Sequence, residues 1–277
     1  MPRLEVKNLS RSFGNLTVVD KVSFQISSGQ VTCLLGPSGC GKSTTLRMIA
    51  GVETPSSGQI FVDGKLIGSA TFQVPPEARS IGLMFQDFAL FPHLNVQQNV
   101  YFGLSGSKDF KQKRSFDLLK KVGLAHLAFN YPHSLSGGEQ QRVALIRALA
   151  PQPKIMLMDE PFSGLDDRLR DEIRDETFNL LRSEDTAVLM VTHDPQEAMK
   201  VADEIALMRG GKILQKGAPY NIYNAPIDLK ALQFFSDANA IQASLNGSLA
   251  DTPFGQFFAP GLSDGIDIDI VFRPQHV

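Results

Sequence analysis

One stretch of the chain has the residue types and spacing of a phosphate-binding loop. The pattern G-x-x-x-x-G-K-[ST] occurs in a run made of Gly36, Pro37, Ser38, Gly39, Cys40, Gly41, Lys42, Ser43 and Thr44. Glycines let backbone N–H groups turn toward an oxyanion, a lysine supplies a mobile positive charge, and a serine hydroxyl can bind Mg²⁺. The alternative is a glycine-rich turn that happens to carry a lysine.

The segments on both sides of this loop favour phosphate binding. Residues 30–35 have the length and apolar character of a buried strand, and Leu46, Ile49 and Ala50 have helical spacing within 43–50. A strand, a glycine loop and a helix in this order bring the free N–H groups and the positive dipole end of the helix to a phosphate.

Two adjacent carboxylates follow a second apolar run, residues 155–158. Neighbouring side chains of a strand face opposite ways, so Asp159 and Glu160 can have different tasks. We expect Asp159 to face Mg²⁺, directly or through water. We expect Glu160 to face the water that attacks the γ-phosphate, as general base or orienting group. The alternative is two exposed acids at the start of a loop.

A second glycine motif stands at the start of a predicted helix, Gly137–Leu149. Ser136, Gly137 and Gly138 would present a hydroxyl, free N–H groups and a positive dipole end to a phosphate. The alternative is a simple helix cap, in which Ser136 and Glu139 form a capping box.

Composition excludes several classes of protein. The chain has 277 residues and a formal net charge of −2. This charge gives no positive electrostatic field that would favour nucleic acid as a partner. Its two cysteines are too few for a disulfide framework and predict a reducing compartment. We find no signal peptide and no apolar run approaching the ~18 residues of a membrane span. We therefore expect a soluble protein, or one held at a membrane by another chain.

The residue patterns of the segments around these motifs predict an α/β core. Alternating residues ahead of the phosphate loop predict an N-terminal antiparallel β patch. Residues 87–153 predict a mostly helical subdomain inserted into the core. Residues 239–277 combine glycine turns with an alternating strand pattern, which predicts part of a small C-terminal β appendage. We expect a domain boundary between residues 1–238 and 239–277.

Taken together, the motifs resemble those of ABC-type ATPases. The run Leu135–Glu139 resembles the signature motif of that family. The other motifs stand in the family's order along the chain, namely the phosphate loop, Gln86 at a strand end, the signature, Asp159–Glu160, Ser163–Asp166 and His193. The resemblance covers residues 3 to about 235 and implies a P-loop ATPase core that binds ATP and Mg²⁺. For residues 239–277 it implies part of a regulatory β-barrel.

The resemblance also implies roles for individual residues. Phe13 would stack on adenine, the alternative being a core phenylalanine. Gln86 would touch Mg²⁺ and the attacking water and link the helical subdomain to the core, and His193 would hold the γ-phosphate. The implied catalytic residues are Lys42, Gln86, Glu160 and His193, and the implied Mg²⁺ ligands are Ser43, Gln86 and Asp159.

The family resemblance further implies two kinds of macromolecular partner. A second copy of the chain would form a head-to-tail dimer around two ATP molecules, with each site completed in trans by Ser136, Gly137, Gly138 and Asp166. The apolar run Phe85–Leu94 predicts a docking groove for a short helix of a membrane permease, the alternative being a segment packed inside the helical subdomain.

Three features indicate the branch of the family. The chain has no spanning helices, only a short stretch between Gln86 and Ser136, and one phosphate loop. These features resemble the peripheral ATP-binding subunit of a bacterial importer at the cytoplasmic face of the inner membrane, served indirectly by a periplasmic or extracellular solute-binding protein. The sequences of residues 75–79 and 85–93 are similar to those of ferric-ion importers.

Other functions remain open at the level of sequence. The solute could be a polyamine, sulfate or a sugar. A non-transport ABC-type ATP switch with a soluble partner is the alternative of another class. A P-loop kinase is a third, although it leaves the signature and the Asp159–Glu160 pair unexplained.

Overall fold

The structure is a computed structural model that describes residues 1–165, 167–237 and 239–273. Its contacts divide the chain into two units, residues 1–220 and 221–277. The predicted domain boundary at 238–239 stays a prediction. The α/β class, the antiparallel N-terminal patch and the helical subdomain are confirmed.

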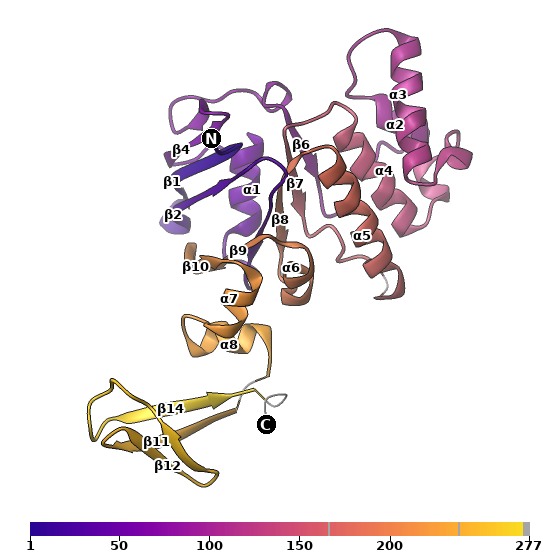
Figure 1. Ribbon diagram of the computed structural model, residues 1–277. Coiled ribbons are helices and arrows are strands. Elements are labelled where there is room, and N and C mark those ends of the chain that lie inside the picture. The colour runs from indigo at the N-terminus through magenta and orange to yellow at the C-terminus, as the bar shows by residue number, and fades with distance from the viewer. Residues whose placement is uncertain (166, 238, 274–277) are drawn as a thin grey trace. The chain divides into compact units, whose positions relative to one another are not determined.

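A six-stranded sheet forms the centre of the first unit (Figure 1). In sheet order its strands are β10 (Lys212–Gly217), β9 (Glu204–Arg209), β3 (Val31–Leu35), β8 (Ala187–Thr192), β7 (Ile155–Asp159) and β6 (Ile81–Met84). The strands from β9 to β6 are parallel, and β10 is antiparallel at one edge. Every residue of β3, β7 and β8 is buried, as expected where helices cover both faces of a parallel sheet.

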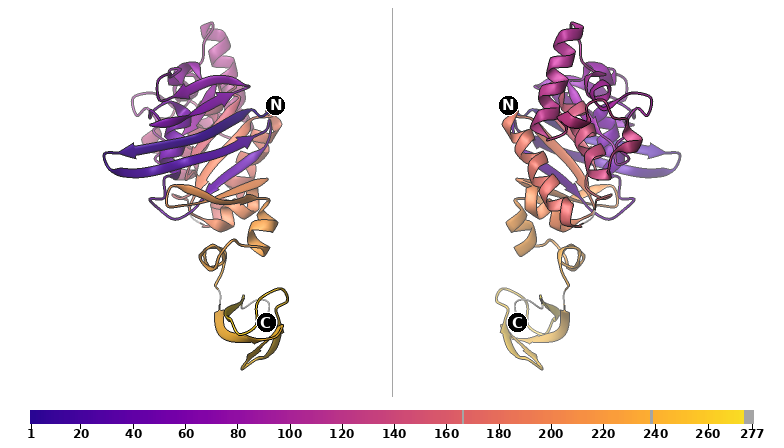
Figure 2. Two further views of the ribbon diagram at one scale, coloured as in Figure 1. Left: turned by 90° about the vertical axis from the view of Figure 1, so that its left-hand side faces the viewer. Right: turned by 90° about the vertical axis from the view of Figure 1, so that its right-hand side faces the viewer.

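The N-terminal patch is a separate antiparallel sheet of four strands. Its order is β2 (Leu16–Ile26), β1 (Leu4–Phe13), β4 (Ser57–Val62) and β5 (Lys65–Ser69). Helix α1 (Lys42–Ala50) lies between the two sheets, and helices α5 (Asp167–Ser183) and α6 (Pro195–Val201) lie on the other side of the central sheet (Figures 1 and 2). Side chains of α1 and of both sheets share one apolar core.

The helical subdomain has an apolar core of its own. Helices α2 (Val96–Tyr101), α3 (Lys108–Lys121) and α4 (Gly137–Leu149) contribute Val96, Leu119 and Val143 to it. The short 3₁₀ helices η2 (Ala125–Leu127) and η3 (Pro132–Ser134) lie in the connection between α3 and α4, whereas a third, η1 (Pro76–Ala78), precedes β6. Helix α4 also contacts β6, so the subdomain is joined to the central sheet through the helix that carries the glycine motif.

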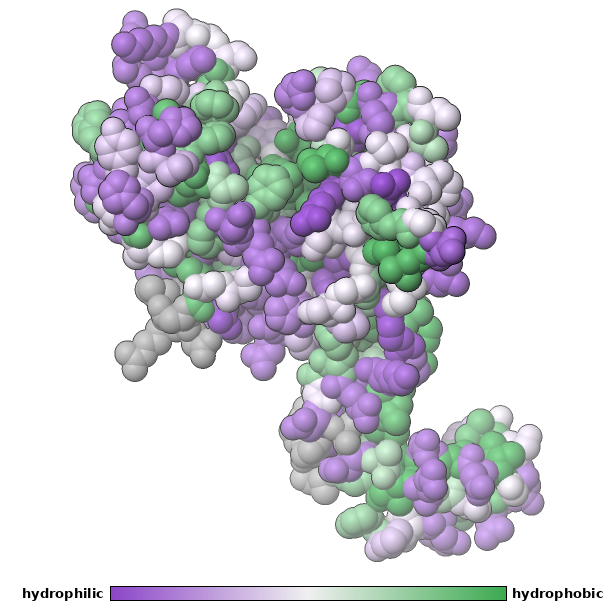
Figure 3. Space-filling view, turned by 180° about the vertical axis from the view of Figure 1, so that it is seen from behind, coloured by the Kyte–Doolittle hydropathy of each residue, from purple (hydrophilic) through white to green (hydrophobic). Residues whose placement is uncertain are grey.

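The second unit contains helix α8 (Leu229–Phe235) and a four-stranded antiparallel sheet, while α7 (Pro219–Asn224) crosses the division between the units. The sheet order is β13 (Gly255–Phe258), β12 (Leu249–Thr252), β11 (Asn239–Asn246) and β14 (Asp267–Phe272). The apolar cluster of this sheet is small and contains the buried residues Ala243, Leu245 and Ala250. Large apolar side chains of this unit are exposed, which Figure 3 shows as green residues on its surface.

One buried arginine joins helix α1 to the loop that precedes β6. Arg79 is only 2% exposed, and its guanidinium donates to the carbonyls of Met48 (3.1 Å), Ile49 (2.8 Å) and Val74 (2.7 Å) and to the side chain of Gln73. Met48 and Ile49 lie in the last turn of α1, where unpaired carbonyls and the negative dipole end favour a cation. The far end of the phosphate-loop helix is thereby fixed.

We expect Arg79→Met to lower the free energy of unfolding by about 2–4 kcal/mol, because it leaves buried carbonyls without their charged donor. Urea denaturation followed by circular dichroism measures this loss. The matched control is Arg3→Met, which removes a partly exposed ion pair with Asp63 and should cost less than about 1 kcal/mol. Equal losses in the two variants would contradict the structural role of Arg79.

Candidate functional site

The predicted phosphate loop connects β3 to α1, and close neighbours constrain its backbone. Gly41 has a left-handed φ of +102°, and a Cβ there would lie 2.4 Å from the carbonyl oxygen of Val18. A Cβ at Gly36 would lie 2.1 Å from the carbonyl oxygen of Met208. Only glycine fits at these two positions, so the neighbouring strands constrain the course of the loop.

The side chain of the loop lysine bends back and bonds to the loop itself. Lys42 is 4% exposed, and its Nζ donates to the carbonyl oxygens of Gly36 (2.7 Å) and Pro37 (3.0 Å). A pocket beside the loop is lined by Val18, Ser38, Gly39, Gly41, Lys42, Ser43, Thr44 and Glu160. Val18 was not predicted, because nothing in its strand pattern shows that β2 passes along the loop.

Ser43 and Asp159 meet next to this loop and form an oxygen pair suited to a hard cation. The Ser43 hydroxyl donates to Asp159 Oδ1 at 2.9 Å. Asp159 ends β7 and is buried, and burial raises its pKa above the ordinary value, although the bond from Ser43 opposes this. Mg²⁺ prefers oxygen ligands and commonly takes one or two carboxylates together with substrate phosphates. The residues present therefore fit such an ion.

Glu160 follows Asp159 but points to a different partner. Its backbone is left-handed, with φ +45°, and its N–H donates to the carbonyl of Val191 at 2.9 Å. Glu160 Oε1 lies 3.0 Å from His193 Nδ1. The turn after β7 thus directs one acid to Ser43 and the other to His193, at the ends of neighbouring parallel strands.

Gln86 shares a pocket with these groups. The pocket is lined by Arg47, Phe85, Gln86, Asp87, Phe88, Asp159, Glu160, Ser163, Gly164 and His193. The end of β6 thereby brings the predicted glutamine to the same edge of the sheet as the two acids. Arg47 was not predicted as a site residue, because one more arginine in a helix gives no signal in sequence.

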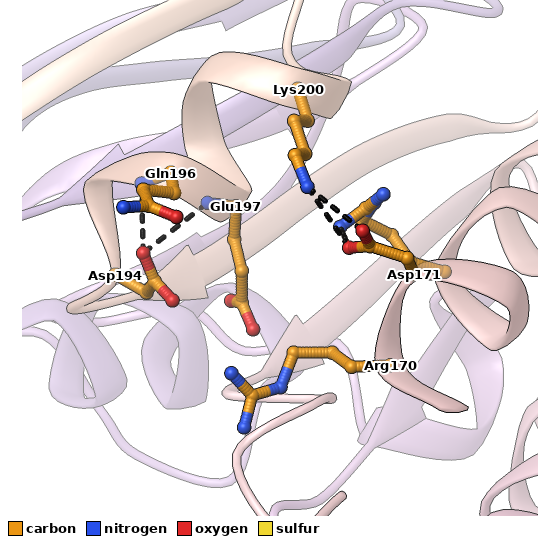
Figure 4. Close-up of a pocket in the computed structure, with 7 residues that line it drawn as sticks. Arg170, Asp171, Asp194, Gln196, Glu197 and Lys200 are labelled. Atoms are coloured by element: carbon orange, nitrogen blue, oxygen red, sulfur yellow. Dashed lines mark hydrogen bonds and ion pairs between the residues drawn. The ribbon is translucent and has the colours of Figure 1, made fainter. Parts of the chain in front are cut away.

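The turn that carries His193 is held by its neighbours in sequence and by helix α6. Asp194 caps α6 by accepting from the N–H groups of Gln196 (2.8 Å) and Glu197 (3.4 Å), as Figure 4 shows. The Thr192 hydroxyl accepts from the N–H of Asp194 and donates to Glu197 Oε2 at 2.7 Å. Glu197 is buried, and burial raises its pKa.

The carboxylate of Glu197 faces a polar pocket between α5 and α6 (Figure 4). In this pocket Lys200 pairs with Asp171 of α5 at 3.0 Å. The sequence did not single out Glu197, since its hydrogen bond to Thr192 forms only when the chain turns at His193.

The second glycine motif forms a helix cap within this chain. The N–H of Ser136 donates to Glu139 Oε2 at 2.8 Å, and the Ser136 hydroxyl accepts from the N–H of Glu139 at 3.4 Å. This bond from the Ser136 backbone lowers the pKa of Glu139. Ser136 and Gly137 are exposed and Gly138 is buried, and none of the three lines the two pockets beside the phosphate loop.

One further predicted site residue lies at the end of strand β1. Phe13 ends β1 and is 47% exposed, so it is not a core residue, and the guanidinium of Arg11 lies over its ring at 4.5 Å from the centroid. Asp166 lies outside the described residues.

Comparison with known proteins identifies relatives along most of the chain. The family model described as ABC transporter matches residues 19–163. The chain is 45% identical over 257 residues to the Fe(3+) ions import ATP-binding protein FbpC of Pseudomonas fluorescens, covering 92% of this chain and 73% of that protein. It is 44% identical over 289 residues to the Putrescine transport ATP-binding protein PotG of Escherichia coli, covering 100% of this chain and 76% of that protein.

Solved structures agree with the fold. An ATP-binding cassette in a dimeric post-hydrolysis state with ADP and Pi matches with a TM-score of 0.68 at 30% identity, over 78% of this chain and 98% of that one. An ATP-binding cassette of an ABC transporter in its ADP conformation matches with a TM-score of 0.73 at 24% identity, over 85% and 98% of the two chains.

A phosphate loop between a parallel strand and a helix, in this fold, defines a P-loop ATPase. The match to the family model and the sequence identities to known relatives identify the family within this class. The chain belongs to the ABC transporter family, and it binds and hydrolyses ATP to power transport.

The thiol within the phosphate loop gives a test of the site. Cys40 is buried with its Sγ 3.9 Å from Lys42 Nζ, and burial raises its pKa although Lys42 opposes the shift. The thiolate is therefore scarce at neutral pH, and alkylation by N-ethylmaleimide should accelerate as pH rises toward the raised pKa. We expect the adduct to abolish ATPase activity, because it crowds the phosphates, and we expect ATP to slow the modification.

The readouts are mass spectrometry of the modified peptide and phosphate release. Cys40→Ala is the control and should keep its activity after the same treatment, because Cys33 is fully buried in β3. Full ATPase activity after confirmed modification of Cys40 would rule out the proposed proximity to the phosphates.

Proposed function

We propose that this chain powers a bacterial importer, in which ATP closes a head-to-tail dimer and a separate membrane permease follows that closure. The observation that carries the proposal is the convergence of three strand ends on one edge of the sheet. There Asp159 reaches Ser43 of the phosphate loop, Glu160 reaches His193, and Gln86 lines the same pocket.

Each of these residues has a task in ATP hydrolysis that its position supports. Lys42 and the N–H groups of the loop bind the phosphates, with Ser43, Asp159 and Gln86 placed to hold Mg²⁺. When bound, this ion would supply positive charge that offsets the negative charge of the phosphates. Glu160 accepts the proton of the attacking water or orients that water. His193, 3.0 Å from Glu160, keeps this carboxylate in place and contacts the γ-phosphate.

The partner of the site is a second copy of the chain. Ser136 and Gly137 are exposed at the N-terminus of α4, where free N–H groups and the helix dipole suit an anion. They line neither of the two pockets described beside the phosphate loop, so we assign them, with Gly138 and Asp166, to the ATP of the partner copy. The exposed ring of Phe13 is assigned to adenine. A related cassette solved as a dimer supports this arrangement.

An apolar groove beside Gln86 suits a short helix of the permease. It is lined by Ile81, Gly82, Leu83, Phe85, Ala89, Phe91, Phe102, Gly103, Arg147, Ala148 and Pro151. Phe102 is 60% exposed there, although it is a large apolar side chain. None of the helices in the described residues is both long and apolar enough to cross a membrane. A separate permease would therefore hold this chain at the cytoplasmic face of the inner membrane.

Ferric ion is the proposed solute, because relatives along the whole chain are Fe(3+) import ATP-binding proteins. A solute-binding protein would deliver it to the permease. The similarity to a putrescine transport protein makes a polyamine the second candidate. A non-transport ATP switch remains the alternative of another class, in which the groove would hold a soluble partner.

We expect Glu160→Gln to keep ATP binding, lower ATP turnover by about 10²–10⁴-fold and trap a dimer, because the nucleophilic water loses its base. Phosphate release and light scattering at saturating ATP-Mg²⁺ measure the two effects. Glu184→Gln, which removes an ion pair with Lys121, is the matched control and should leave both unchanged. A monomeric Glu160→Gln protein at saturating ATP would contradict the dimer mechanism.

The transport assignment can be tested in a bacterial strain that lacks this chain. Wild-type protein should restore uptake of radiolabelled ferric ion, and Lys42→Ala should not, because it loses nucleotide binding. Uptake of radiolabelled putrescine, measured in parallel, tests the second candidate. Purification from membranes should also recover an integral membrane protein. Recovery of soluble proteins alone would favour the ATP switch.

A further inference from the structure

One arginine connects the helix of the glycine motif to the turn that follows Gln86. Arg147 lies near the C-terminal end of α4, the helix that begins after Ser136. Its Nη1 donates to the carbonyl oxygen of Ala89 at 2.6 Å, and its Nη2 donates to the carbonyl oxygen of Phe88 at 2.9 Å. A single guanidinium therefore holds two consecutive carbonyl groups, which its planar fork is shaped to do.

The two carbonyls belong to a strained turn. Phe88 and Ala89 have φ values of +58° and +45°, a left-handed conformation that costs a residue other than glycine about 1–2 kcal/mol. Local bonds from the N–H of Phe88 to Phe85 and from the N–H of Ala89 to Asp87 form the turn itself. Strain of this kind persists only where surrounding groups hold the backbone in place. Arg147, on helix α4, holds the backbone of this turn through its two hydrogen bonds.

The same side chain is part of the apolar groove. The guanidinium carbon of Arg147 lies 5.4 Å from the ring centroid of Phe91, and the side chain lines the groove together with Phe85 and Phe102. Arg147 is half-buried, and burial lowers its pKa, while the carboxylate of Asp87 opposes the shift. An arginine stays protonated in proteins, so its cation is stabilised here by the two carbonyls and the aromatic face.

Arg147 thus belongs to α4, the helix that carries the signature motif. It bonds to the turn that follows Gln86, here called the Gln86 turn, and it lines the groove. We propose that it is a positioning residue that fixes the Gln86 turn to α4, so that Gln86 and a helix seated in the groove move together with the signature. Its part in hydrolysis rests on the role of Gln86 in the proposed function. A lysine cannot replace it, because one ammonium group does not hold two carbonyls and lie over a ring in a fixed geometry.

Amide hydrogen exchange tests the fixation directly, without reference to activity. In Arg147→Lys and Arg147→Gln, exchange of the amides of residues 87–91 should become about 10–100-fold faster, since a charge-assisted pair of bonds is lost. Exchange within α1 should not change. Arg142→Lys, on the same helix with an ion pair to Glu176, is the matched control and should leave residues 87–91 unaffected. Unchanged exchange in both Arg147 variants would overturn the proposal.

Kinetics then test whether Arg147 acts through Gln86. We expect Arg147→Lys to lower kcat about 10-fold with an unchanged KM for ATP, because the phosphate loop is not touched. In a Gln86→Ala background the same substitution should cause no further loss. An equal loss of kcat in that background would overturn the positioning role. If Gln86→Ala alone leaves kcat unchanged, the proposed role of Gln86 fails, whereas the exchange experiment still decides the fixation by Arg147.

Discussion

The phosphate loop keeps its shape because two neighbouring strands place backbone atoms directly against it. The carbonyl of Val18 in β2 leaves no room for a Cβ at Gly41, and the carbonyl of Met208 in β9 leaves none at Gly36. These strands belong to the two different sheets of the first unit, with α1 between them. The N–H groups of the loop are therefore oriented by the packing of the whole unit, and a phosphate need not order them when it binds.

The parallel strands β7 and β8 likewise fix the positions of the two acids and of His193. Because β7 and β8 are adjacent and in register, Glu160 and His193 leave the sheet side by side, and Asp159 lies opposite Val191. At Glu160 the backbone is left-handed, and the two adjacent acids have different partners, Ser43 for Asp159 and His193 for Glu160. In the proposed function one carboxylate serves the cation side of the site and the other the water side. The strain at this residue is one element of the arrangement that allows both.

The sequence predicted much of this, and what it missed has a physical reason. The loop, the acid pair and helix α4 follow from local patterns, and α4 has the predicted bounds, Gly137–Leu149. Helix α6 has seven residues, too few for a clear period, and was missed. The contacts of Val18, Glu197 and Arg147 join segments that only the fold brings together, and an arginine beside strained carbonyls has no signature in a single sequence.

In the proposed dimer, Ser136 would serve both of the roles that the sequence left open, helix cap and phosphate contact. Within this chain the Ser136 hydroxyl accepts from the N–H of Glu139, which forms part of the helix cap, and donates to Glu139 Oε2 at 2.8 Å. In the proposed dimer that hydroxyl must turn to a phosphate oxygen of the partner's ATP. The carboxylate of Glu139 keeps its bond from the Ser136 N–H, and the Ser136 oxygen still accepts from the Glu139 N–H when only the hydroxyl proton is redirected, so the cap survives. Closure therefore exchanges one anionic acceptor for another at little cost to α4, and a capping box and a phosphate site can share one serine.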